Sequence, residues 1–163
     1  MSADARRTQD QHPALGTTLP PLSLVGPDGR RRGLHEVIAG RAAVVHFMRS
    51  ATCPACLAHA AQVQRMHDAG ELGGAAFLLL APGTAAEAAT AAERAARRAP
   101  LAEVWATGDH GDAGLRKVAL LQHSGTFVLD ARGVVRSART SALPVSSFSA
   151  DEVRTALSPA PAA

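Results

Sequence analysis

Short apolar runs alternate along the chain with longer segments in which apolar residues recur every three or four positions. The short runs suit buried strands, because helices of globular proteins are usually longer. They predict strands at residues 22–25, 42–47, 75–80 and 101–105, and a hairpin of strands at 126–130 and 134–139. The residues between the two hairpin strands, Ala131-Arg132-Gly133, are typical of a turn.

The longer segments carry signals for helices. The first is predicted to run from Pro54 to about Ala69, and Gly70 follows it as a common helix terminator. Capping boxes at residues 84–87 and 149–152 open a second and a third helix. The order strand, helix, strand, helix, strand, strand, helix predicts an α/β protein with a thioredoxin-like fold, in which helices flank a central mixed sheet.

The chain of 163 residues suits a single domain. We predict that residues 16–157 form the thioredoxin-like domain, that residues 1–15 form a flexible N-terminal arm, and that residues 158–163 form a disordered tail. Apolar residues make up 47% and charged residues 19% of the chain, which favours a globular protein.

Composition and charge exclude several classes of function. Aromatic residues make up only 3%, so modules that stack nucleic-acid bases on aromatic rings are disfavoured. The net charge of +3 is dispersed, and its densest runs are Arg30-Arg31-Arg32, in a predicted turn, and Arg97-Arg98, at a predicted helix end. No apolar leader and no membrane-spanning run is visible, so we expect a soluble cytoplasmic protein.

Candidate chemistry concentrates at the chain's two cysteines, in Cys53-Pro54-Ala55-Cys56. Cys53 falls at the predicted N-cap of a helix and Pro54 at its first position, where the partial positive charge and free N–H groups favour a thiolate. Cys53 is therefore the predicted nucleophile, with a lowered pKa. Cys56 lies inside the first turn and is the predicted resolving thiol, able to close a local disulfide. The alternatives are a fortuitous buried pair and a metal site.

A metal site would need histidine ligands, because two cysteines do not complete a zinc site. The chain has seven histidines: His12, His35, His46, His59, His67, His110 and His123. Each is individually more typical of a surface or core position than of a ligand. His123, before the strand predicted at 126–130, is the most interesting exception, and His46, in the strand before the cysteine pair, is the second.

The stretch Val44-Val-His-Phe-Met-Arg-Ser-Ala-Thr-Cys-Pro-Ala-Cys56 resembles the active-site region of peroxiredoxin-like proteins of the alkyl hydroperoxide reductase/thiol-specific antioxidant (AhpC/TSA) group. Many of these proteins have a Phe six residues and an Arg four residues before the first cysteine. Gly125-Thr-Phe-Val-Leu-Asp-Ala-Arg-Gly-Val-Val-Arg136 is similar to their late strand pair. The resemblance covers most of the chain, from about Gly16 to Leu157.

The sequence departs from the family pattern at several positions. The usual Pro-x-x-x-Thr-x-x-Cys has His46 in place of the Pro and Ser50 in place of the Thr. The family's distal Arg, which steadies the thiolate, falls at Ser124, and Gly125 stands where thioredoxins have a cis-Pro. Arg49 is the candidate substitute for the missing Arg, and an exposed loop charge is the alternative for it.

The resemblance implies a thiol peroxidase. Cys53 would attack a peroxide, Cys56 would resolve the sulfenate as a CxxC disulfide, and Ser50 and Arg49 would assist. A thioredoxin-like or low-molecular-weight thiol would reduce the disulfide, no cofactor is expected, and a homodimer is compatible with the family. The first alternative is a thiol-disulfide oxidoreductase acting on protein or small-molecule disulfides. The second is a copper-binding protein similar to the Sco family, with Cys53, Cys56 and His123 as ligands.

Overall fold

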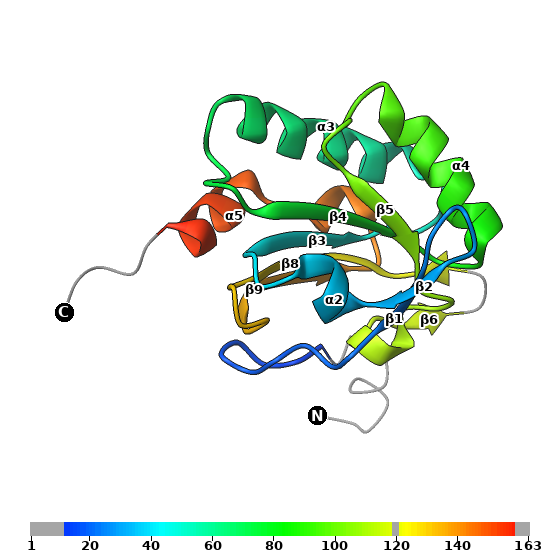
Figure 1. The fold of residues 1–163 in the computed structure, drawn as a ribbon, viewed down its shortest axis with the longest axis horizontal. Helices are drawn as coiled ribbons and strands as arrows, with labels where there is room; N and C mark the ends of the chain where they lie inside the picture. The colour runs from blue at the N-terminus through cyan, green and yellow to red at the C-terminus, as the bar shows by residue number, and fades with distance from the viewer. Residues whose placement is uncertain (1–11, 119–120, 159–163) are drawn as a thin grey trace.

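The computed structural model describes residues 12–118 and 121–158. Its centre is a seven-stranded mixed sheet with the strand order β2-β1-β5-β4-β3-β8-β9 (Figure 1). The strands of this sheet are β1 (Ser23–Val25), β2 (Arg31–Gly33), β3 (Ala43–Phe47), β4 (Ala76–Ala81), β5 (Glu103–Ala106), β8 (Ser124–Leu129) and β9 (Val135–Ser141). A separate small hairpin pairs β6 (Lys117–Val118) with β7 (Leu121–Gln122).

The strands β3, β4 and β5 run parallel to one another in the middle of the sheet. Val45 pairs with Leu78, and Leu80 pairs with Trp105. Because these strands run in one direction, the loops that follow them gather at one edge of the sheet. The strand β8 lies antiparallel to β3 and brings Thr126 opposite His46.

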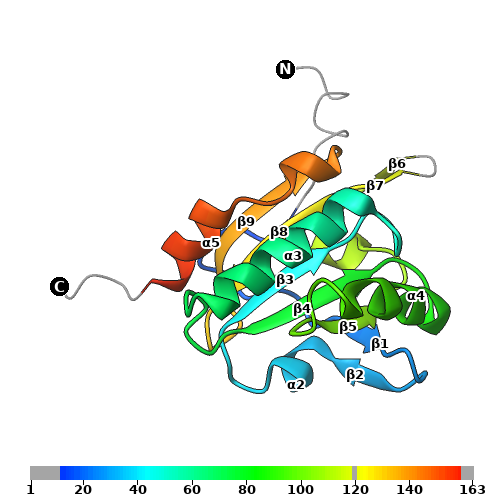
Figure 2. The same cartoon turned by 90° about the horizontal axis from the view of Figure 1, so that it is seen from above.

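Helices cover both faces of the sheet (Figures 1 and 2). On one face lie α3 (Pro54–Asp68), α4 (Ala85–Ala96) and α5 (Ala150–Leu157). On the other lie α2 (Leu34–Ile38) and the short 3-10 helix η1 (Gly111–Ala113), whereas a second 3-10 helix, η2 (Pro144–Ser146), precedes α5. Alternate residues of each strand point to opposite faces, so two apolar cores form.

The predicted α/β architecture and its main elements are confirmed. The helix predicted at 54–69 is α3, and the Glu87 carboxylate accepts a hydrogen bond from the Thr84 N–H at 2.7 Å where the sequence predicts a capping box. Ser149 caps α5 by accepting from the Glu152 N–H at 3.3 Å. These signals are local, so the sequence carries them without knowledge of the tertiary structure.

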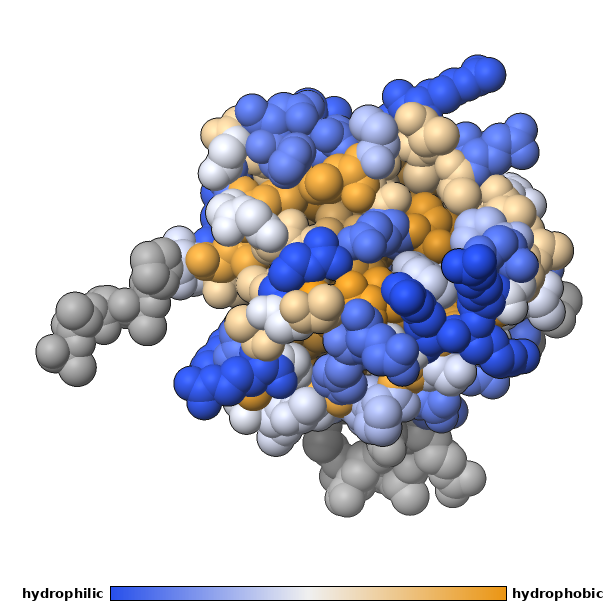
Figure 3. Space-filling view, in the orientation of Figure 1, coloured by the Kyte–Doolittle hydropathy of each residue, from blue (hydrophilic) through white to orange (hydrophobic). Residues whose placement is uncertain are grey.

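Two parts of the prediction need correction. Arg31 and Arg32 lie in the edge strand β2, not in a turn, and pair with Val25 and Leu24 of β1. Their side chains are exposed, and the surface in that part of the molecule is largely hydrophilic (Figure 3). Charge on an edge strand discourages pairing with other chains. The helix α2 and the β6–β7 hairpin were not predicted, because each is too short to set up a period.

The ends of the chain fall largely outside the described residues. The arm predicted for residues 1–15 is described only from His12, and the tail predicted for 158–163 only at Ser158. No helix among residues 12–118 and 121–158 is long and apolar enough to cross a membrane.

Candidate active site

The cysteine pair lies at the start of α3, on the edge where the parallel strands end. Cys53 is the N-cap residue and Pro54 is the first helical residue. The Cys53 Sγ accepts a hydrogen bond from the Cys56 N–H at 3.3 Å, and the Cys53 carbonyl accepts from the Leu57 N–H at 3.0 Å. A sulfur thus takes the place that an Asp or Ser oxygen has in an ordinary helix cap.

Both cysteines are free thiols and both are nearly covered. The Cys53 side chain is 5% exposed and Cys56 is fully buried. The Cys56 Sγ accepts a hydrogen bond from the Arg49 backbone N–H at 3.5 Å, which ties the helix to the loop after β3. Of the two sulfurs, only that of Cys53 is open to attack from outside.

The surroundings shift the pKa values of the two thiols in opposite directions. Hydrogen bonding from the Cys56 side chain lowers the pKa of Cys53 to about 6, with further help from the Cys56 and Ala55 N–H groups and from the charge of Arg49, and against the effect of burial. The hydrogen bond to Cys53 and then burial raise the pKa of Cys56 far above its ordinary value. Cys53 is therefore mainly a thiolate at pH 7, and Cys56 stays a thiol.

Arg49 and Ser50, the other predicted site residues, differ in their surroundings. Arg49 is half-buried, and its guanidinium has no hydrogen-bond or ion-pair partner among residues 12–118 and 121–158. Ser50 is exposed; its carbonyl accepts from the Cys53 N–H at 3.2 Å, and within the described part of the chain its hydroxyl has no partner. The structure thus brings the charge of Arg49 close enough to act on Cys53, and it does not pair the Ser50 hydroxyl with either sulfur.

His46 lies buried under α3 with a defined tautomer. The Thr126 hydroxyl donates its only proton to the Ser147 carbonyl at 2.7 Å, so it accepts from the His46 Nδ1–H at 2.8 Å. The His46 Nε2 then carries a lone pair, and this buried atom has no partner among the described residues. Burial, with the nearby His59 and His110, lowers the pKa of His46 to about 3, so the ring is neutral at pH 7.

The second buried side-chain atom without a partner among the described residues is the Ser124 hydroxyl oxygen. The sequence resemblance to peroxiredoxin-like proteins aligns His46 with their Pro and Ser124 with their distal Arg, so both atoms belong to residues that depart from that pattern. The ring of His59, on α3, lies 5.6 Å from that of His46, and its Nε2–H donates to the Pro144 carbonyl at 2.8 Å. His46, Thr126 and His59 therefore form a polar region beneath α3.

His110 has a structural role that the sequence did not reveal. Its Nε2 bonds to the Met48 carbonyl at 2.7 Å and its Nδ1 to the Thr107 hydroxyl at 2.6 Å, so it ties the loop after β3 to the loop after β5. Burial lowers the pKa of His110 to about 4. No sequence signal marks this contact, because it joins residues 62 positions apart.

His123 is buried on the approach to β8, but it forms no metal centre with the cysteines in the described structure. Residues 12–118 and 121–158 contain no group of three or more His, Cys, Asp or Glu side chains placed to hold a metal ion. The copper-binding alternative with Cys53, Cys56 and His123 therefore gains no support from the geometry.

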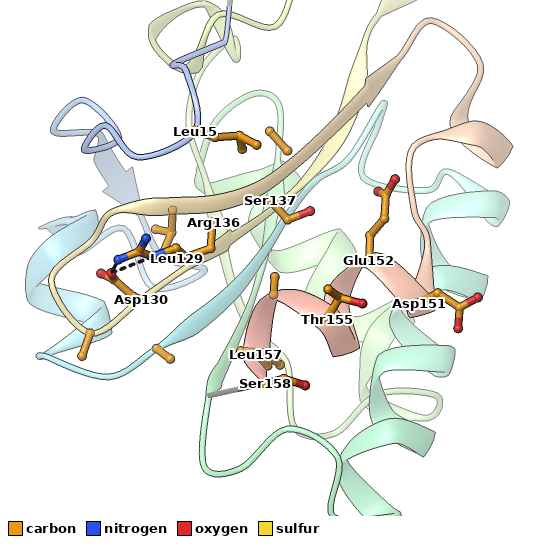
Figure 4. Close-up of a pocket in the computed structure, with 14 residues that line it drawn as sticks. Leu15, Leu129, Asp130, Arg136, Ser137, Asp151, Glu152, Thr155, Leu157 and Ser158 are labelled. Carbon is orange, nitrogen blue, oxygen red and sulfur yellow. Dashed lines mark hydrogen bonds and ion pairs between the residues drawn. The ribbon is translucent and has the colours of Figure 1, made fainter. Parts of the chain in front are cut away.

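A cavity of about 390 Å³ opens beside Arg49. It is lined by Arg49, Pro82, Gly83, Glu87, Gly108, Asp109, Lys117 and Gln122. A larger cavity, of about 840 Å³, lies at the opposite end of the sheet, between the β8–β9 hairpin, α5 and Leu15 (Figure 4). Of these two cavities, the smaller one is lined by Arg49, whose backbone N–H bonds to the Cys56 Sγ.

No family model matches the sequence, and no curated protein sequence matches it either. Solved structures do match. A peroxidoxin, BcpB, from Mycobacterium tuberculosis is 21% identical with a TM-score of 0.66, over 90% of this chain and 97% of its own. The reduced Prx3 of Vibrio vulnificus, in complex with H2O2, is 22% identical with a TM-score of 0.68, over 90% and 99%. The thiol peroxidase of Chromobacterium violaceum is 16% identical with a TM-score of 0.73, over 91% and 87%.

The chain shares the thioredoxin-like fold of these three structures. The coverage of nine tenths of the chain by three such structures confirms the fold predicted from the sequence. At these identities the likeness concerns the fold, and the chemistry rests on the site itself.

Proposed function

We propose that this chain is a thiol peroxidase in which Cys53 attacks the peroxide and Cys56 resolves the product. The observation that carries the proposal is the Cys53 sulfur at the N-cap of α3, whose pKa of about 6 makes it a thiolate at neutral pH. A thiolate held at a helix N-terminus is the nucleophile that peroxide reduction requires. The fold shared with a peroxidoxin and a thiol peroxidase supports the same reading.

In the proposed reaction the Cys53 thiolate attacks one peroxide oxygen, the O–O bond breaks, and the other oxygen leaves as an alcohol or water after taking a proton. Cys53 is then a sulfenic acid. The Cys56 thiol attacks its sulfur, which forms the Cys53–Cys56 disulfide and releases water. Two equivalents of a reducing thiol restore both cysteines.

The side chains proposed to assist are Arg49 and Ser50. The half-buried Arg49 guanidinium is free to stabilise the negative charge that develops on the leaving oxygen. Ser50, exposed beside Cys53, is proposed to turn its hydroxyl toward a bound peroxide. The Cys56 and Ala55 N–H groups, which face the Cys53 sulfur, complete the set of donors.

The deciding experiment mixes the fully reduced protein rapidly with hydrogen peroxide and follows disulfide formation by the loss of two mass units. Free cysteine is the control. We expect oxidation about 100-fold or more faster than for free cysteine, because preorganised donors contribute roughly that factor. Cys56→Ser should consume peroxide once and leave a sulfenic acid on Cys53 that dimedone traps. Oxidation at the rate of free cysteine would contradict the proposal.

A thiol-disulfide oxidoreductase is the second candidate. One observation favours it, namely that Ser124 stands where peroxiredoxins have the Arg that polarises the O–O bond, and its hydroxyl has no partner among the described residues. If peroxide reacts slowly while the reduced protein cleaves insulin disulfides, this second function replaces the first.

A further inference from the structure

The cavity beside Arg49 is lined by the loops that follow β3, β4 and β5, at the edge of the sheet where the cysteine pair also lies. Gly83 follows β4 and Gly108 follows β5, and their backbones bond to each other in both directions. His110 fastens the same region to the Met48 carbonyl, next to Arg49. The walls of the cavity are therefore held in place by the fold itself.

The lining of this cavity carries charges of both signs that do not pair with one another. The side chains of Arg49 and Lys117 have no hydrogen-bond or ion-pair partner in the described part of the chain. The carboxylate of Glu87 bonds to Thr84 through Oε2, and that of Asp109 bonds to the Gly111 N–H through Oδ1. Two cations and two carboxylates thus line the same cavity, and each can still form a hydrogen bond or ion pair with a ligand.

The volume and the charges select a class of ligand. A cavity of 390 Å³ lies within the range of small-molecule sites, and it exceeds what a hydrogen peroxide molecule needs, since one water takes about 30 Å³. An apolar hydroperoxide would offer no partner to the two cations or to the second oxygen of either carboxylate. A small zwitterion, with carboxylate for the cations and ammonium for the carboxylates, satisfies both signs.

Arg49 connects the cavity to the cysteine pair. Arg49 lines the cavity, and its backbone N–H bonds to the Cys56 Sγ. The Cys53 sulfur is nearly covered and Cys56 fully so, which favours attack by a small molecule that enters beside Arg49. Arg49 therefore joins the cavity to the cysteine pair.

We propose that this cavity binds the reductant of the Cys53–Cys56 disulfide, and that the reductant is a low-molecular-weight thiol of amino-acid type, bearing carboxylate and ammonium groups. The inference rests on the proposed function. The thiolate attacks the Cys53 sulfur, which forms a mixed disulfide and releases Cys56 as a thiolate that takes up a proton. A second thiolate attacks the sulfur of the bound thiol, which releases the oxidised dimer of the reductant and the Cys53 thiolate.

The test starts from protein oxidised with diamide, so it needs no reaction with peroxide. Its reduction is followed by mass with four thiols: cysteine, 3-mercaptopropionate, cysteamine and 2-mercaptoethanol. Rates are expressed per thiolate present, which removes the differences in acidity. We expect cysteine to react at least about tenfold faster than 2-mercaptoethanol and to saturate, because a docked thiol gains effective concentration.

Two variants give the control. Lys117→Gln removes one cation of the cavity and should slow cysteine and 3-mercaptopropionate about fivefold, the size of one partly exposed ion pair, without changing the rate for 2-mercaptoethanol. Arg132→Gln removes an exposed charge from the β8–β9 turn, at the opposite end of the sheet, and should change no rate. Lys117 is itself exposed, so its loss should not affect folding.

Equal rates per thiolate for all four thiols, with Lys117→Gln matching the parent protein, would overturn the inference. So would reduction by a thioredoxin-type protein that is far faster than by cysteine and indifferent to Lys117→Gln, because the reductant would then be a protein. Failure of the peroxide experiment alone would remove the peroxidase and leave the selectivity for thiols standing.

Discussion

The two cavities of this protein differ in what their charges do. In the larger one, Asp130 is held by the Arg136 guanidinium through contacts of 2.7 and 3.0 Å (Figure 4), and Glu152 is held by Arg139 at 2.7 and 2.8 Å. In the smaller one, Arg49 and Lys117 have no partner among the described residues. The larger cavity offers more volume, but its carboxylates Asp130 and Glu152 are already paired with arginines.

This difference is why we place the proposed ligand at the smaller cavity, whose cations have no partner among the described residues, and not at the larger one. An ion pair in a surface groove contributes little stability, about 0–1 kcal/mol. Because its charges already have partners, it gives no reason to expect a charged ligand. A half-buried guanidinium without a carboxylate has given up part of its hydration and has gained no protein partner for it. We therefore expect changes at the larger cavity to alter stability slightly, and changes at the smaller one to alter chemistry.

The largest expected effect comes from charges that low pH creates inside the protein. The pKa of His46 is lowered to about 3 and that of His110 to about 4. Below pH 6.5 the unfolded chain takes up these protons and the folded protein does not, so stability is full above pH 6.5 and falls as the pH decreases toward 4. The slope is about 1.4 kcal/mol per pH unit for each histidine.

Urea unfolding at several pH values between 7.5 and 4.5 measures this slope. His110→Gln should reduce the slope by about half, whatever it costs at pH 7.5, whereas His67→Gln, at an exposed position of α3, should leave it unchanged. Equal slopes in all three proteins would show that the buried ring of His110 is not a source of the slope.

The next effect concerns the wall of the smaller cavity. Gly83 has φ +114°, and a Cβ there would lie 2.6–2.8 Å from the Glu87 side chain. Gly83→Ala should therefore lower the free energy of unfolding by about 1–2 kcal/mol through backbone strain, and displace the carboxylate that caps α4. Gly29→Ala is the matched control, because Gly29 also has a positive φ but open space around it. If both variants lose the same stability and keep the same selectivity for thiols, the contact with Glu87 has no consequence.

A smaller effect is expected from the charge of Arg49 on the nucleophile. Arg49→Gln should raise the pKa of Cys53, and the shift should be modest, because hydrogen bonds from Cys56 lower that pKa more than Arg49 does. Alkylation by iodoacetamide as a function of pH measures it, with a decrease of about two- to threefold expected at pH 6 for a partly screened charge. Arg132→Gln should retain the parent profile. An unchanged profile for Arg49→Gln would show that the charge of Arg49 does not lower the pKa of Cys53.

The smallest effect is expected at the larger cavity. Arg139→Met breaks the pair with Glu152, two side chains that are 40% and 42% exposed, and should cost no more than about 1 kcal/mol of stability. Its rates with peroxide and with cysteine should match those of the parent protein. A loss of either reaction would mean that the larger cavity takes part in the chemistry, and would break the contrast between the two.

The sequence predicted what local patterns can determine. Cys53 at the N-cap, Pro54 at the first helical position and the contrast between the two thiols follow from residues within four positions of one another. The polar region under α3 does not follow in this way, because His46, Thr126 and Ser147 meet only after β3 and β8 have paired. The contact from His110 to Met48 and the cavity beside Arg49 likewise depend on loops that the sheet brings together.

The sulfur that caps α3 also has a consequence for the reduction potential of the pair. The hydrogen bond from the Cys56 N–H to the Cys53 sulfur is strong when that sulfur is an anion and weak when it is half of a neutral disulfide. The cap therefore favours the dithiol over the proposed Cys53–Cys56 disulfide, and we expect that disulfide to be easier to reduce than one without such a hydrogen bond. We therefore expect the pair to spend little of its time oxidised wherever a reducing thiol is present.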